Sequence, residues 1–205
     1  DGFMQNGSFI TLALFDKPEP MNGPYFEESY YLTPSTHTKQ QQEQIIQQTE
    51  KACNAYGLTH GPIHAEAKLT KNGVVIIEIA SRSIGGQCAQ LIEYVLGTKL
   101  EELIIRLMCL ERIEFSHQNT YAGVLMIPIK QGGILKRVEG LLQAQQTPYI
   151  TQLEIHIQPG YELIPLPEGS SYLGFIFAAS DNYQKTYRAL QHAYRKLTFI
   201  TSKRW

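Results

Sequence analysis

Apolar and polar residues alternate along the first part of the chain, as they do in strands that bury one face. An Asn-Gly pair at 6–7 separates two such segments, and another at 72–73 separates segments 61–70 and 74–80. Asn-Gly pairs favour the tight turns of β-hairpins, because both residues tolerate positive φ. The pattern therefore predicts two antiparallel hairpins.

Helical spacing follows a predicted strand at 29–33. The residues that recur at this spacing are Ile45, Ile46, Thr49, Ala52, Cys53 and Tyr56. We expect a helix that starts at 34–36, ends near Tyr56 and stops at Gly57, since glycine often terminates helices. The glutamine-rich stretch 40–48 is then its solvated face.

Later segments continue this mixture of helices and strands. Two helices are expected at about 87–96 and 99–110, divided by Gly97, and polarity rises around 114–120, where we place a domain boundary. The elements expected beyond it are strands near 121–129, 134–138, 151–158 and 172–179, a helix near 140–146, and a helix at 182–197 capped by Ser180 or Asp181. Hairpins with flanking helices indicate an α+β fold.

Residues 16–28 contain three prolines and one glycine, which predicts a loop with fixed bends. The charges at its two ends, in Asp16-Lys17 and Glu27-Glu28, favour a solvated surface, as is usual for loops, and the alternative is a lid or substrate-recognition segment.

Composition narrows the class of protein. The 205 residues include 18 basic and 19 acidic ones, so charge gives no reason to expect nucleic acid or an anionic membrane as a partner. No apolar run approaches the roughly 20 residues that span a bilayer. Cys53, Cys88 and Cys109 match neither a metal spacing nor a disulfide framework, so we expect buried thiols in a reducing, cytoplasmic compartment.

The second hairpin carries the candidate chemistry. Because residues two apart on a strand share a face, His64, Glu66 and Lys68 should lie together on its first strand. On its second strand the residues expected to share a face are Ile76, Glu78, Ala80 and Arg82. If the register aligns these faces, Glu66 and Glu78 approach one another.

Adjacent carboxylates repel unless a cation or a proton lies between them, and oxygen ligands of this kind suit Mg²⁺. Arg82 could then bind phosphate oxygens and His64 could donate to an oxyanion. The alternative is a solvated sheet face on which Arg82 bridges both glutamates. The apolar residues around Glu78 favour a partnered site, because buried acids need partners.

The sequence GPIHAE at 61–66, the Asn-Gly turn and EIASRSIGG at 78–86 resemble the metal-binding hairpin of the ATP-grasp superfamily. The likeness is greatest to the branch of L-amino-acid ligases, or dipeptide synthetases. This resemblance implies that Glu66 and Glu78 hold Mg²⁺ or Mn²⁺ against the phosphates of ATP. It also implies that Arg82 stabilises an acyl-phosphate and that His64 lies against the reacting carboxylate.

Three further residues take binding roles under this resemblance. Lys68, Gly85 and Gly86 are expected to contribute to cofactor binding, the glycines at the edge of the substrate pocket. Many superfamily members place a metal-ligating asparagine where this chain has Ala80. The amino-acid-ligase branch tolerates a small residue there.

The resemblance covers nearly the whole chain. It assigns 1–116 to the C-terminal part of an ATP-grasp domain and 117–205 to a small α+β domain of amino-acid-ligase type. The expected reaction joins a small carboxylic acid to an amine, with ATP and Mg²⁺ or Mn²⁺. The rest of the nucleotide site is expected upstream of Asp1, in an N-terminal part of the same chain, so these residues alone should be inactive.

Nucleic acid and membranes are not expected partners, and a homodimer is left open. Two alternatives also stay open: a non-catalytic α+β binding or assembly module, and an ATP-grasp enzyme of biotin-carboxylase-like or purine-biosynthetic type. No P-loop, dinucleotide fingerprint or serine nucleophile elbow is present in the sequence.

Overall fold

The computed structural model describes residues 1–19 and 29–203, so most of the loop expected at 16–28 lies outside the described residues. The chain forms two compact units. The first unit comprises Asp1–Phe15 and Thr33–Asn119, and the second comprises Asp16–Leu32 and Thr120–Trp205. The assignment of family domains to 1–116 and 117–205 stays a prediction, since a compact unit does not by itself identify a domain family.

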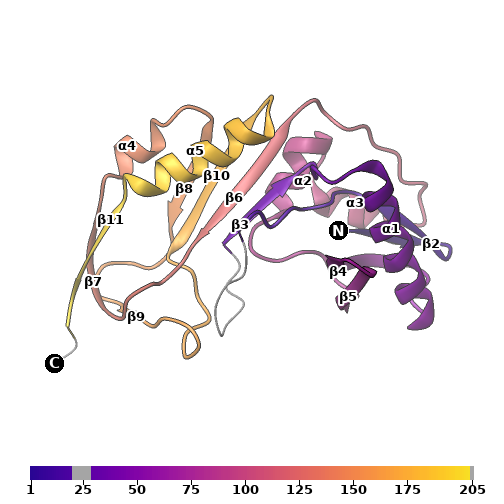
Figure 1. Ribbon diagram of the computed structural model, residues 1–205, viewed down its shortest axis with the longest axis horizontal. Coiled ribbons are helices and arrows are strands. Elements are labelled where there is room, and N and C mark those ends of the chain that lie inside the picture. Colours follow the sequence, from indigo (N-terminus) through magenta and orange to yellow (C-terminus); the bar gives the residue numbers. More distant parts are fainter. Residues whose placement is uncertain (20–28, 204–205) are drawn as a thin grey trace. The chain divides into compact units, whose positions relative to one another are not determined.

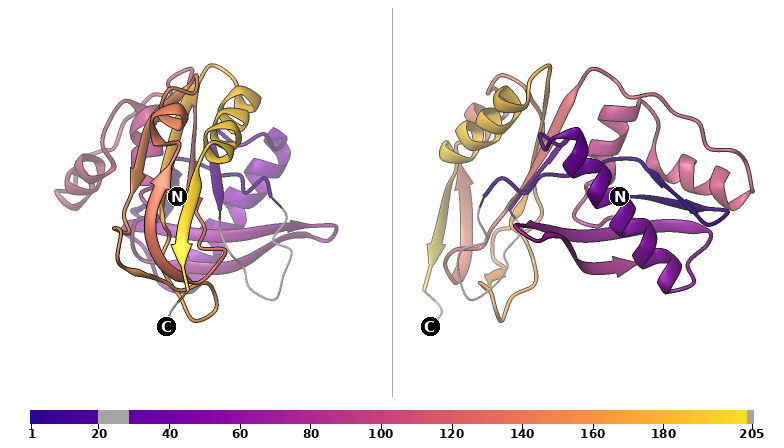
Figure 2. Two further views of the ribbon diagram at one scale, coloured as in Figure 1. Left: turned by 90° about the vertical axis from the view of Figure 1, so that its left-hand side faces the viewer. Right: turned by 45° about the vertical axis from the view of Figure 1, so that its right-hand side comes forward.

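A four-stranded antiparallel sheet forms the frame of the first unit, in the order β2-β1-β4-β5 (Figure 1). Its strands are β1 (Gly2–Gln5), β2 (Ser8–Thr11), β4 (Gly61–Thr70) and β5 (Gly73–Ala80). The long hairpin of β4 and β5 is drawn in purple in Figure 2. Both predicted tight turns are confirmed. The first is formed by Asn6 and Gly7, with φ of 53° and 82°, and the second by Lys71 and Asn72, since Gly73 already pairs with Thr70.

Helix α1 (Lys39–Ala55) packs on this sheet. Its buried residues Thr49 and Cys53 lie on one side, and Cys53 clusters with Met4 and Ile63 of the strands. The predicted start at 34–36 is wrong. The helix begins later, at Lys39, because Thr38 and Gln41 form a capping box that satisfies the first free backbone amides.

Two shorter helices complete the first unit, α2 (Ala89–Leu96) and α3 (Leu100–Met108). Gly97 divides them in the left-handed conformation, with φ of 70°, as expected from the sequence. The prediction of three buried cysteines is wrong for Cys109, which is exposed at the C-cap of α3. Cys53 and Cys88 are buried.

The second unit contains two sheets. One has the order β3-β6-β10-β8, from strands β3 (Tyr30–Thr33), β6 (Tyr121–Ile127), β10 (Gly174–Ser180) and β8 (Ile150–Ile155). The other has the order β11-β7-β9, from β11 (Thr198–Ser202), β7 (Gly133–Glu139) and β9 (Glu162–Leu163). The sequence analysis missed β9 and β11, which are short.

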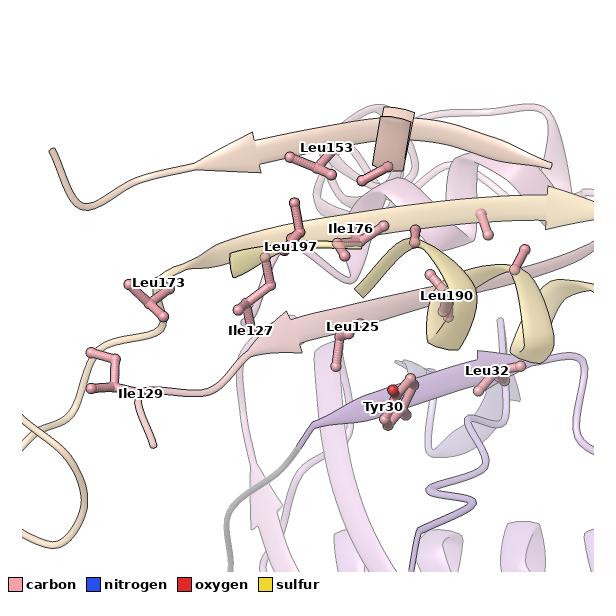
Figure 3. Close-up of a cluster of buried hydrophobic side chains, with 14 of the residues drawn as sticks. Tyr30, Leu32, Leu125, Ile127, Ile129, Leu153, Leu173, Ile176, Leu190 and Leu197 are labelled. Atoms are coloured by element: carbon pink, nitrogen blue, oxygen red, sulfur yellow. The ribbon is translucent and has the colours of Figure 1, made fainter. Parts of the chain in front are cut away.

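Helices α4 (Leu141–Gln145) and α5 (Tyr183–Arg195) accompany these sheets. Figure 3 shows Leu190 of α5 directed toward Leu125 and Ile176 of the larger sheet, and all three side chains are fully buried or nearly so. The N-cap of α5 is Asn182, which accepts hydrogen bonds from the Gln184 and Lys185 amides, so the predicted cap at Ser180 or Asp181 is wrong.

Antiparallel sheets with packed helices confirm the predicted α+β class. Across the described part of the chain, every helix is too short or too polar to cross a membrane.

Candidate functional site

The register of the β4–β5 hairpin places the two predicted metal ligands opposite each other. Glu66 pairs directly with Glu78, and His64 pairs with Ala80. Directly opposed residues of an antiparallel pair project to the same face, with Cβ atoms about 4.5–5.5 Å apart. The backbone therefore brings the two carboxylates together on one face of the sheet.

A β-bulge follows this pair. The register shifts between Glu66 and Ala67, so that Ala67 pairs with Ile76 and Ile77 is the extra residue of β5. The prediction that Ile76 shares a face with Glu78 is therefore wrong, because the inserted residue reverses the alternation. The bulge interrupts regular pairing next to the two acids, and pairing continues on both sides of it.

Lys68 keeps its predicted place on the face of Glu66, since alternation along β4 is uninterrupted. It pairs with Val75 and its side chain is exposed.

Each carboxylate has one basic neighbour. His64 Nε2 lies 3.6 Å from Glu66 Oε1, with the two side chains 9% and 22% exposed. Arg82 Nη2 lies 3.5 Å from Glu78 Oε1, with the two side chains 56% and 51% exposed. The four groups form one patch in which the two acids lie side by side with a basic residue beyond each, enclosed at its histidine end and open at its arginine end.

The exposure of Glu78 corrects one expectation. Its apolar neighbours suggested a buried acid, but β5 is an edge strand of the sheet, and half of the Glu78 side chain reaches solvent. Solvent access suits a carboxylate that must exchange a protein partner for a ligand.

The donor set of this site fits a hard divalent cation that shares its other ligands with phosphate. Within the described residues, no cluster of three or more histidine, cysteine, aspartate or glutamate side chains could enclose a metal. Mg²⁺ typically takes only one or two protein carboxylates and completes its shell with water and substrate oxygens. Two paired glutamates match that requirement and do not match an all-protein metal cage.

The segment after β5 carries Arg82 and the two predicted glycines. Arg82 Nη1 donates to the Ser83 carbonyl oxygen over 3.0 Å. A side chain at Gly85 would meet no atom within 4 Å, and Gly86 has φ of 59°, in the left-handed region. This short backbone segment is therefore open on the side of Gly85.

Sequence reasoning missed Asp1 as a neighbour of this segment. The Ile84 amide donates to Asp1 Oδ2 over 3.4 Å, across 83 positions of the chain. No local pattern could have revealed a contact between residues so far apart in sequence.

Two family comparisons match most of the chain. Residues 1–91 match the ATP-grasp domain, and residues 125–202 match L-amino acid ligase C-terminal domain 2. The first match includes the paired glutamates and Arg82.

Similar proteins agree with these matches. A curated relative, dapdiamide A synthase of Enterobacter agglomerans, is 28% identical over 63% of this chain and 32% of its own length. The solved L-amino acid ligase of Bacillus licheniformis shares the fold with a TM-score of 0.87 at 23% identity, over 98% of this chain and 51% of that one. The solved phosphoribosylglycinamide synthetase of Anaerococcus prevotii also shares the fold, with a TM-score of 0.80 at 18% identity. This match covers 98% of this chain and 52% of that one.

The chain thus spans about half the length of these solved structures and about a third of the curated relative.

Proposed function

Because the chain belongs to the ATP-grasp superfamily, in the branch of the L-amino acid ligases, we propose that it is the C-terminal part of an ATP-dependent carboxylate–amine ligase. In the first step a substrate carboxylate oxygen attacks the γ-phosphorus of ATP and releases ADP, which gives an acyl-phosphate. In the second step an amine attacks the acyl carbon and displaces phosphate, and the nitrogen loses a proton. The product is an amide or a dipeptide.

The observation that carries this proposal is the direct pairing of Glu66 with Glu78. These two carboxylates would hold Mg²⁺ or Mn²⁺. The cation neutralises charge on the phosphates that it binds. Two adjacent carboxylates on one sheet face repel each other, and a cation between them would offset this repulsion.

Arg82 is proposed to bind the oxygens of the acyl-phosphate. Its guanidinium is within 3.5 Å of Glu78, so it lies beside the proposed metal position. A planar fork of N–H donors matches phosphate oxygens in pairs, which a lysine ammonium cannot do.

His64 is proposed to lie against the reacting carboxylate. Its ring is nearly buried, and Nε2 points to Glu66 at 3.6 Å, so it also restricts the orientation of that acid. Lys68, Gly85 and Gly86 are proposed to bind the nucleotide or the substrate. The open space at Gly85 would let a ligand approach the backbone.

The test replaces Glu78 with glutamine in the full-length protein, with Glu139→Gln as the matched control. Glu139 is also a strand residue paired with an arginine, at 2.7 Å, and its side chain is 49% exposed, against 51% for Glu78. We expect Glu78→Gln to reduce amine-dependent phosphate release from ATP by about a hundredfold or more, as loss of a charge-stabilising group does. Its circular dichroism should match that of wild type.

Glu139→Gln should keep wild-type turnover. Normal turnover by Glu78→Gln would remove Glu78 from the metal role. A full-length protein that neither binds Mg-ATP nor releases phosphate would instead be the non-catalytic binding module.

An enzyme of purine-biosynthetic type is the nearest alternative, since phosphoribosylglycinamide synthetase shares the fold. The match of residues 125–202 to an L-amino acid ligase domain favours the amino-acid-ligase type. Trials with amino acids and with phosphoribosylamine as amines separate the two.

A cytoplasmic location is also proposed, because Cys53, Cys88 and Cys109 are all free thiols, as is usual in reducing compartments. A homodimer stays a prediction that sedimentation of the full-length protein can test.

A further inference from the structure

We propose that Asp1 is a positioning residue that fixes the segment carrying Arg82, an inference that rests on the proposed ligase function. The hydrogen bonds of the Asp1 carboxylate go to the backbone and not to the paired glutamates. It acts through the backbone of Ile84, two residues after Arg82.

The Asp1 carboxylate joins two parts of the first unit. Oδ1 accepts from the Gly2 amide over 3.2 Å, and Oδ2 accepts from the Ile84 amide over 3.4 Å. The residue is 9% exposed, so water competes little for these hydrogen bonds. One oxygen is therefore held by strand β1, and the other holds the segment that follows β5.

The backbone of Asp1 is itself fixed. Its carbonyl oxygen accepts from the amides of Leu12 and Ala13 over 3.0 and 3.2 Å. At the next position, a Cβ on Gly2 would lie 2.3 Å from the Ile10 carbonyl oxygen, so only glycine lets β1 lie this close to β2. The Asp-Gly pair thus forms a rigid support for the carboxylate.

The segment that Asp1 holds needs such a support. It runs from the end of β5 at Ala80 to the start of α2 at Ala89 and contains Gly85 and Gly86, which allow the backbone many conformations. Arg82 is 56% exposed, and its guanidinium contacts Glu78 and the carbonyl oxygen of its neighbour Ser83. The position of its guanidinium therefore depends on its own backbone, and displacements of about 1 Å can lower turnover by two orders of magnitude.

The experiment compares Asp1→Ala and Asp1→Asn in the full-length protein, with Glu50→Ala as the matched control. Glu50, in helix α1 of the same unit, also has a carboxylate that accepts a hydrogen bond from a backbone amide, that of Phe9, over 2.8 Å. Phe9 belongs to β2, which lies away from Arg82. Turnover number, the KM for ATP, and amide hydrogen exchange over 81–88 are measured for each variant.

We expect Asp1→Ala to reduce kcat about tenfold or more, to leave the KM for ATP within about twofold, and to speed exchange over 81–88. Asp1→Asn keeps an acceptor oxygen and should recover most of the turnover. Glu50→Ala should speed exchange around Phe9 and leave kcat unchanged.

Wild-type kcat in Asp1→Ala, or exchange that speeds everywhere equally, would overturn the positioning role. If the wild-type protein shows no ligation, the proposed function fails, while exchange at 81–88 still decides whether Asp1 holds this segment. The two failures are therefore distinguishable.

Discussion

Replacement of Arg82 by glutamine should separate a catalytic arginine from a structural one. The ion pair between Arg82 and Glu78 is 3.5 Å long, and both side chains are more than half exposed. Exposed pairs of this kind contribute about 0–1 kcal/mol to folding. For a protein of this size, such a loss lowers Tm by at most about 4 °C.

The expected effect on turnover is much larger. A preorganised donor that stabilises developing charge contributes about 3–4 kcal/mol to the barrier, which corresponds to a loss of about 10²–10³ in kcat. Arg82→Gln should therefore reduce catalysis far more than it reduces stability. Arg82→Lys should be intermediate, because it keeps the charge and loses the planar fork.

The assay measures phosphate release and thermal unfolding on the same full-length samples. The control is Arg137→Gln, which removes an arginine of similar exposure, 62% against 56%, from its pair with Glu139 at 2.7 Å. Arg137→Gln should leave turnover unchanged, and it should shift the Tm by no more than about 4 °C. A loss of turnover in Arg82→Gln no greater than in Arg137→Gln would refute a catalytic arginine.

Two further predictions concern the second unit. A Cβ on Gly123 would lie 3.0 Å from Leu32 Cγ and 3.1 Å from Leu190 Cδ1. Gly123→Ala should therefore lower the free energy of unfolding by about 1–3 kcal/mol, measured in urea. An unchanged free energy of unfolding would contradict this close packing. Burial, and then the charge of Glu19, raises the pKa of Tyr30 above its ordinary value of about 10. As pH rises, Tyr30 therefore ionises in the unfolded chain before it ionises in the folded protein, so its contribution to the free energy of unfolding is complete below about pH 10 and falls above it. Tyr30→Phe should weaken this fall in stability. An unchanged profile of stability against pH would contradict the prediction.

Local signals in the sequence predicted the hairpin that carries the candidate site. The tight turn sets the pairing from Thr70–Gly73 to Ala67–Ile76, which continued without interruption would oppose Glu66 to Ile77. The β-bulge at Ile77 shifts the register by one residue and thereby places Glu66 opposite Glu78 on one face. Gly97 and Gly57 ended helices as predicted, because a left-handed residue is a local requirement.

The remaining features depend on contacts between distant residues. The bulge at Ile77 depends on how the edge strand pairs, and the exposure of Glu78 depends on its being at that edge. The hydrogen bond between Asp1 and Ile84 spans most of the first unit in sequence. Periodicity carries no information about such pairs, so they required the folded structure.

The most direct test of the central claim is a crystal structure of the full-length protein with ADP and Mn²⁺, in which anomalous scattering locates the metal. We predict a manganese peak between Glu66 and Glu78, with a carboxylate oxygen of each about 2.0–2.3 Å from the metal. Manganese bound only to the nucleotide phosphates, with both glutamates well ordered and away from it, would contradict the account.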